Sequence, residues 1–213
     1  MNELKKTTAF GGAAVVLVVL ALLTAPRRAV PDAFFDVGET FFPEFTDPDT
    51  ATTLEVVRFD EETAAAAIFR VTNRNGLWTI PTHHDYPADG KERLARTAAE
   101  VIAITKDDFR SDNVTDHEAF GVIDPLDQSV STLRGRGRRV TFKGASEEVL
   151  GDLIIGNPVE GQPGLNFVRV PDQNRVYAAR TNIDISTRFN DWIETNLLEV
   201  ERDDVKHIAL NEY

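Results

Sequence analysis

An apolar run near the N-terminus constrains this chain more than any other feature of its sequence. Residues 9–25 contain no charged side chain, and the run is flanked by two lysines before it and two arginines after it. An apolar helix over residues 7–26 would be roughly 30 Å long, which is enough to cross the hydrocarbon core of a membrane. We therefore expect residues 1–28 to form an N-terminal transmembrane anchor.

The same run is also compatible with a cleavable signal peptide, with Leu23, Thr24 and Ala25 ahead of the cleavage site. Pro26 would then follow the scissile bond directly, and a rigid imino residue suits a peptidase poorly there, so we favour a retained anchor. A short basic N-terminal tail usually stays in the cytoplasm. We expect a single-pass protein of the cell inner membrane, with the bulk of the chain extracytoplasmic.

The charge of the chain bears on the kind of partner it can bind. The net charge is -12, and the first 28 residues contribute +3, so the remainder of the chain carries -15. Such an acidic domain repels the phosphates of nucleic acid, and no nucleic-acid partner is expected. The chain contains no cysteine, which excludes disulfides, zinc–thiolate sites, iron–sulfur clusters and thiol nucleophiles.

Residues 29–53 are rich in proline and phenylalanine. Prolines interrupt helices and strands, so this segment is predicted to be a tether between the anchor and the domain. Its five phenylalanines are too many for a spacer, and we expect them to contact the domain or the membrane interface. The folded extracytoplasmic domain is expected over residues 54–213.

Alternating apolar patterns and turn-forming residues predict a series of hairpins. Asn73, Arg74, Asn75 and Gly76 form the clearest turn, with glycine placed where a positive φ is needed. The expected strands are residues 54–59, 66–72, 77–80, 140–143, 149–155, 167–170 and 175–179.

Helical spacing of apolar residues predicts two principal helices. In the first, Leu94, Ala98, Val101 and Ile102 share one face, and Asp89 is placed to cap the helix. In the second, the apolar face consists of Phe189, Trp192, Ile193 and Leu197, with Ser186 or Thr187 as the cap. A short helix is also expected at residues 116–120. Together these elements predict an α+β domain, a mainly antiparallel sheet of hairpins with two packing helices.

One cluster of side chains suggests catalysis or metal binding. His83, His84 and Asp85 lie together, and imidazole and carboxylate groups can ligate zinc or transfer protons. Adjacent histidines in an extended segment point to opposite sides, however, and no HExxH spacing is present. We therefore expect a polar connection here, with a metal-dependent hydrolase as the alternative function; no catalytic residue and no cofactor are predicted.

Two loops are candidates for contact with a partner. The one basic run of the chain carries Arg134, Arg136, Arg138 and Arg139, separated by glycines, and it lacks a complete phosphate-binding pattern. A charged hairpin edge is the simplest interpretation, and contact with an acidic partner is the alternative. A second loop rich in turn residues contains Asn157, Glu160 and Gln162, which are further candidates for partner contact.

Five short motifs in consistent order resemble domain-of-unknown-function family 4340. They are W-T-I-P at residues 78–81, Y-P-A-D at 86–89, G-V-I-D-P at 121–125, L-I-I-G at 153–156 and F-V-R at 167–169. The resemblance implies an N-terminally anchored protein of the kind often encoded beside ABC-transporter components of the gliding-motility or auxiliary-export type. It supplies no catalytic residues. Family members are commonly longer, so the chain is expected to be either a shortened member or a split gene product.

These observations lead to one preferred function and two alternatives. We expect a non-catalytic, membrane-anchored accessory protein that binds a transporter permease or a related exported subunit. The alternatives are a hydrolase that uses the segment around His83, and a purely structural envelope protein.

Overall fold

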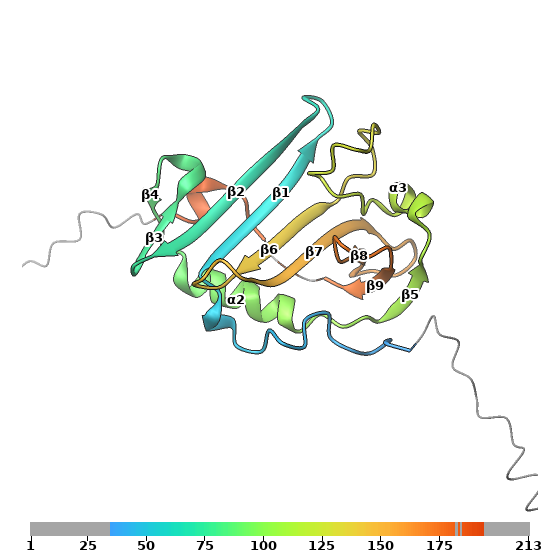
Figure 1. Cartoon of the computed structure of the whole chain (residues 1–213), viewed down its shortest axis with the longest axis horizontal. Coiled ribbons are helices and arrows are strands. Elements are labelled where there is room, and N and C mark those ends of the chain that lie inside the picture. Colours follow the sequence, from blue (N-terminus) through green and yellow to red (C-terminus); the bar gives the residue numbers. More distant parts are fainter. Residues whose placement is uncertain (1–34, 182, 184, 194–213) are drawn as a thin grey trace, which may run out of the picture. The chain divides into compact units, whose positions relative to one another are not determined.

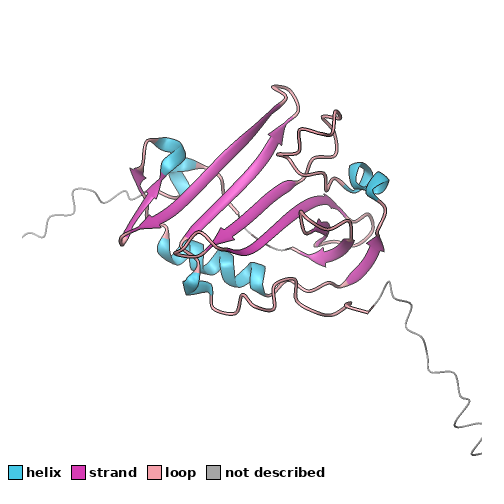
Figure 2. Cartoon of the chain, viewed as in Figure 1, coloured by secondary structure: helices cyan, strands magenta, loops and turns pink. Residues whose placement is uncertain are grey.

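One antiparallel sheet forms the body of the folded unit (Figures 1 and 2). The computed structural model describes residues 35–181, 183 and 185–193, and the unit begins at Asp36. Within these residues the strand order is β4-β3-β2-β1-β6-β7-β8-β9-β5, and each neighbouring pair is antiparallel. The expectation of a mainly antiparallel sheet is confirmed.

The observed strands match the expected ones and add two short ones, β4 and β5. The strands are β1 (Thr53–Asp60), β2 (Ala65–Arg74), β3 (Leu77–Ile80), β4 (Tyr86–Pro87), β5 (Asp108–Ser111), β6 (Arg138–Lys143), β7 (Val149–Pro158), β8 (Leu165–Arg169) and β9 (Val176–Arg180). The helices among the described residues are α2 (Lys91–Ile102) and the single turn α3 (His117–Phe120).

β1 joins the two sets of hairpins at the centre of the sheet. It pairs with β2 on one side and, on the other, with β6, which lies far along the chain. Val56 lies opposite Phe69 on β2 and opposite Val140 on β6, and all three side chains are buried. Since alternate residues of a strand point to opposite faces, this register lines up one apolar row across the sheet.

α2 covers that apolar face. Its buried residues Leu94, Ala98 and Val101 contact the sheet residues of the main core, as their helical spacing predicts. The opposite face carries a second, small core of Val122, Ile154 and Val176 beneath α3. The sheet therefore has one helix on each face, and they cover different parts of it.

The predicted cap of α2 is wrong. The helix begins one residue later than expected, so Gly90 occupies the N-cap position and no side chain caps the helix there. A Cβ at Gly90 would lie 3.0 Å from the Val71 side chain and 3.1 Å from the Trp78 ring, so glycine allows a closer approach to the strands than a larger residue would. Asp89 is exposed, and its main-chain N–H donates instead to the carbonyl of Trp192 at 2.9 Å.

The described part of the expected tether lies on the domain. Phe41 and Phe45 are buried in the main core, and the Phe41 ring meets Tyr177 edge-on with centroids 5.5 Å apart. Phe35 is 70% exposed. Burying aromatic rings is strongly favourable, so from Asp36 onwards this segment is held by the core despite its prolines.

A buried carboxylate ties the start of this segment to β9. Asp36 is 4% exposed; it accepts a hydrogen bond from the Tyr177 hydroxyl, and the Lys106 ammonium lies 3.0 Å away. Burial alone would raise the pKa of Asp36, but these hydrogen bonds and the positive charges of Lys106 and Arg175 outweigh it and hold the pKa below its usual range. Burial and the bond to Asp36 raise the pKa of Tyr177.

The expected C-terminal helix does not begin as an α-helix in the described residues, because a 3₁₀ turn is followed by a β-bridge between Ile193 and Ala88; the rest of that expectation and the expected membrane anchor lie outside the described residues. A 3₁₀ turn spans Phe189–Asp191, and Trp192, 1% exposed, donates from its indole nitrogen to the carbonyl of Ser186 at 2.8 Å. The expected helix through Leu197 continues beyond residue 193, and the expected anchor ends before residue 35. Within the described ranges, no helix is long and apolar enough to cross a membrane.

The Asp36 contacts predict a specific pH dependence of stability. A carboxyl group whose pKa is lowered by folding stabilises the folded state above its unfolded pKa, near 3.8, and this contribution disappears as pH falls through the folded pKa. We expect Asp36→Asn to lower the free energy of unfolding by about 2 kcal/mol at pH 7. The difference from the wild type should shrink below about pH 4.

The measurement is denaturant unfolding of the full-length chain between pH 3 and pH 7. Asp49→Asn, at an exposed carboxylate of the same segment, is the matched control and should change stability by less than about 0.5 kcal/mol at every pH. A constant difference between Asp36→Asn and the wild type across this range would contradict the role given to the charge.

Candidate functional site

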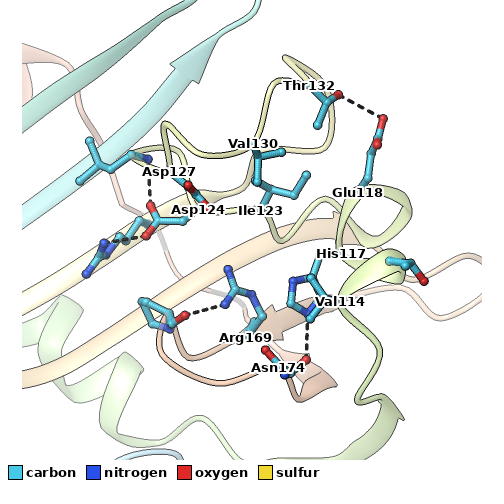
Figure 3. Close-up of a pocket in the computed structure, with 14 residues that line it drawn as sticks. Val114, His117, Glu118, Ile123, Asp124, Asp127, Val130, Thr132, Arg169 and Asn174 are labelled. Atoms are coloured by element: carbon cyan, nitrogen blue, oxygen red, sulfur yellow. Dashed lines mark hydrogen bonds and ion pairs between the residues drawn. The ribbon is translucent and has the colours of Figure 1, made fainter.

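A cavity of about 620 Å³ opens beside α3, on the face of the sheet opposite α2 (Figure 3). Its walls come from the segment that includes α3, the loop that follows it, β6, β8 and the turn after β8. The charged or titratable residues of the walls are His117, Glu118, Asp124, Asp127, Arg139 and Arg169, and the apolar ones are Val114, Ile123, Leu126, Val130 and Pro171.

Glycines let the main chain of α3 and Gly121 lie directly on β7 and on the segment just before β6. A Cβ at Gly156 would lie 2.4 Å from the carbonyl oxygen of Phe120, and one at Gly135 would lie 2.4 Å from that of Glu118. A Cβ at Gly137 would lie 2.7 Å from the carbonyl oxygen of Gly121. The glycines of the basic run therefore serve backbone packing, and the cavity beside α3 depends on that close approach.

Arg169 projects from β8 into the floor of the cavity and is 6% exposed. Its Nε donates to the carbonyl of Val122 at 2.9 Å, and its Nη1 donates to the carbonyls of Pro171 at 2.6 Å and Gln173 at 3.0 Å. Among the described residues, none accepts a hydrogen bond from Nη2. Burial lowers the pKa of Arg169, and the Asp124 carboxylate partly offsets this.

His117 lies beside Arg169 in the same cavity and is 5% exposed. Its Nε2 is 2.8 Å from the carbonyl oxygen of Asn174, which can only accept, so Nε2 carries the proton. Burial lowers the pKa of His117, and the bond to Asn174 offsets part of this. At neutral pH the ring is therefore neutral, and Nδ1 retains a lone pair that can accept a hydrogen bond or a proton.

Arg139 is committed to carboxylates at the side of the cavity. Its Nε and Nη2 bind both oxygens of Asp152 at 3.0 and 2.6 Å, and its Nη1 binds Asp124 at 2.8 Å. The hydrogen bonds to Asp152 raise the pKa of Arg139. This two-point pairing fixes Asp124 at the wall and neutralises the guanidinium.

The remaining arginines of the basic run have different environments. Arg136 is half-buried and donates to four main-chain carbonyls, those of Thr132, Asp124, Asp127 and Val130, while its guanidinium lies 4.6 Å from the centroid of the Phe59 ring. It holds the loop that forms one cavity wall. Arg138 is half-buried on β6, and Arg134 is exposed at the surface of the loop.

The second predicted contact loop lies on the other side of α3. Asn157 donates from its side-chain amide to the carbonyl of Ala119 at 3.1 Å, which joins the loop to α3. Gln162 accepts from Arg110 on β5 at 3.0 Å, and Glu160 is exposed. The two predicted loops thus both contact the α3 segment, and the cavity beside that segment is formed only by the tertiary fold.

The segment of His83, His84 and Asp85 does not form a cluster of ligands. The His83 ring stacks on Phe189 with centroids 4.7 Å apart, while His84 and Asp85 adopt left-handed backbone conformations. In the part of the chain that the structure describes, no group of three or more His, Asp or Glu side chains is arranged to hold a metal ion.

The described structure is that of an antiparallel α+β domain whose side-chain cavity is built around a single-turn helix. The chain belongs to the family described as "Domain of unknown function (DUF4340)", which matches residues 78–213. This confirms the resemblance seen in the sequence, and β1 and β2 precede the matched region. No curated protein and no solved structure matches the chain.

Sequence reasoning missed His117, Arg169 and Asp127 as wall residues of one cavity. A signal was nevertheless present: Asp124 belongs to the G-V-I-D-P motif and Arg169 to the F-V-R motif, two of the motifs that carry the family resemblance. These two motifs are more than forty residues apart in the sequence, and the fold brings Asp124 and Arg169 to the walls of the same cavity. His117 lies in no motif, and only the fold reveals it.

The close backbone contact at Gly156 predicts that even a methyl group is too large there. We expect Gly156→Ala to lower the free energy of unfolding by about 2 kcal/mol, because the new Cβ would overlap the main chain of α3. Gly151→Ala, on the same strand, is the matched control and should change stability by less than about 1 kcal/mol, since only the Phe42 side chain must move. Denaturant unfolding of both variants compares the two effects, and equal values would contradict the packing argument.

The four carbonyl contacts of Arg136 predict a structural role for this residue. We expect Arg136→Ala to lower the free energy of unfolding by about 2 kcal/mol and to make the loop over residues 124–134 sensitive to protease. Arg134→Ala, two positions earlier and exposed, should change neither property. Limited proteolysis with mass spectrometry measures the effect; protection of the loop in Arg136→Ala would contradict it.

Proposed function

We propose that this chain is a membrane-anchored extracytoplasmic protein that binds another protein and does not catalyse a reaction. The observation that carries the proposal is the apolar rim of the cavity beside α3. Val114 is 57% exposed, Leu126 is 39% exposed, and Leu133, on the loop of the cavity wall, is 43% exposed. Apolar side chains gathered on one surface around a concave site are typical of protein-binding surfaces.

The rim is supported by a rigid frame. Arg136 holds the loop that carries Leu126, and the glycine contacts hold α3 against the sheet. A preorganised surface loses little conformational entropy on binding, so such a frame favours recognition of a partner. Arg134 and Glu160, both exposed on the flanking loops, supply polar groups at the edge of the same surface.

The identity of the partner is inferred from the resemblance and from the N-terminal segment. The basic-flanked apolar run favours an anchor at the inner membrane. The resemblance to the family implies a protein encoded beside ABC-transporter components, and this implication supports the choice of partner. We therefore propose a transporter permease, or an exported subunit associated with it, as the partner. The chain then acts as an accessory subunit of an ABC-type transport system.

The test is a mild-detergent pull-down of the tagged full-length chain from membranes, with mass spectrometry of the proteins that accompany it. We expect permease and ATPase subunits with the wild type, and at least about a tenfold loss with the double variant Val114→Ser and Leu126→Ser, because two exposed apolar contacts are removed. Leu77→Ser, at a 60% exposed leucine on β3, is the matched control and should retain the partner.

A wild-type chain that brings down no membrane protein would contradict the proposal. Loss of the partner to the same extent in Leu77→Ser and in the double variant would show that the rim of the cavity is not the contact surface.

A further inference from the structure

Two nitrogen atoms of buried side chains in the cavity make no hydrogen bond within the described residues. One is Nη2 of Arg169, which can only donate, and the other is Nδ1 of the neutral His117 ring, which can accept. Both side chains are more than nine-tenths buried, and both face the cavity (Figure 3). The two nitrogen atoms themselves are not enclosed by protein, so the cavity offers a ligand one donor and one acceptor on side chains that are otherwise buried.

The other side-chain nitrogen atoms of these two residues already make hydrogen bonds. Three carbonyls hold the Arg169 guanidinium in place through Nε and Nη1, and Asn174 holds the His117 ring through Nε2. Neither side chain can turn away without breaking these bonds. The donor and the acceptor are therefore fixed in position before a ligand arrives.

The charge of the walls selects against acidic ligands. Glu118, Asp124 and Asp127 line the cavity, and the Ser129 hydroxyl and main-chain N–H hold the pKa of Asp127 below its usual range, so it stays ionised. Arg139 is neutralised by two carboxylates, which leaves Arg169 as the cation that faces the cavity from its described walls. A neutral or basic ligand suits this arrangement.

The apolar part of the walls is aliphatic. It consists of Val114, Ile123, Leu126, Val130 and Pro171, and none of the described lining side chains carries a phenyl, phenol or indole ring. Carbohydrate sites usually present such ring faces, whereas aliphatic walls suit the side chains and methylene groups of a peptide. In an extended peptide the N–H and C=O of one residue point to the same side, which matches an adjacent acceptor and donor.

We propose that this cavity binds an extended, neutral or basic peptide segment of a partner protein, whose main-chain carbonyl accepts from Arg169 Nη2 and whose N–H donates to His117 Nδ1. The inference rests on the proposed function and deepens it, because it names the chemistry of the segment that the accessory protein recognises. Lysine or arginine next to the bound residue would lie near Glu118 and Asp127.

The test uses ligand-observed saturation-transfer NMR on the purified full-length chain. The probes are N-acetyl-lysine N-methylamide, N-acetyl-glutamate N-methylamide and methyl glucoside. We expect the lysine probe to bind with a Kd of about 1 mM, the affinity usual for a molecule of its size, and the glutamate probe at least about fivefold more weakly. Methyl glucoside should show no saturation.

Two variants of exposed residues at the cavity test the location without disturbing the core. Thr115→Trp should block the mouth and abolish binding of the lysine probe, and Glu118→Gln should reduce the difference between the lysine and glutamate probes to less than about twofold. Leu77→Trp, at an exposed position on β3, is the matched control and should bind as the wild type does.

Binding of methyl glucoside in place of the capped amino acids, or binding of none of the probes, would overturn the proposal. So would binding of the lysine probe that persists in Thr115→Trp. The mild-detergent pull-down distinguishes the peptide cavity from the accessory role. If the partner accompanies Thr115→Trp as well as it accompanies the wild type, the cavity is not the peptide site, and the accessory role stands. If the wild type brings down no partner although Thr115→Trp abolishes binding of the lysine probe, the accessory role is refuted and the cavity still binds the probe.

Discussion

The pairing of β1 with β6 is the contact on which the rest of the fold depends. It joins the hairpins formed by β1 to β4 to the hairpins formed by β6 to β9, and it continues one apolar row across the sheet. Without it, Val56 and Leu54 would lose neighbours on one side, and α2 would have no continuous surface to cover. Because the two strands are far apart in the chain, their pairing is entropically expensive, and the apolar contacts under α2 offset that expense.

One buried arginine and two half-buried ones organise the other face of the sheet. Arg136 and Arg169 both direct their N–H groups at main-chain carbonyls of nearby loops, and Arg139 joins two carboxylates. Loops have many carbonyls without partners in regular structure, and a guanidinium can satisfy several at once. The contacts of these arginines fix the positions of the loops that form the walls of the cavity beside α3. The groups that the cavity offers to a ligand are the nitrogen atoms of Arg169 and His117 that make no hydrogen bond among the described residues.

The fold of the domain could largely be predicted from its sequence, and the site only in part. Strands and α2 followed from periodicity, which is a local property of the chain. The cap of α2 did not: Gly90, which lies close to the Val71 and Trp78 side chains, occupies the N-cap position in place of Asp89, and such long-range proximity is not visible in the local sequence. The roles of the arginines were also beyond the sequence, since Arg134, Arg136 and Arg139 lie within six residues of the chain and enter three different environments: solvent, loop carbonyls and a pair of carboxylates.

The sequence by itself determined the apolar N-terminal run, the acidic character of the remainder, the antiparallel hairpins and membership of the family, because periodicity, composition and ordered motifs can be read along the chain. Only the tertiary structure decided that His117 and Arg169 meet in one cavity. Their proximity depends on the close contact of α3 with β7. That contact requires glycine at position 156, because a Cβ there would overlap the carbonyl oxygen of Phe120, and only the folded structure brings these two residues together. The chemistry of the cavity is therefore a consequence of long-range packing, which no local pattern in the sequence encodes.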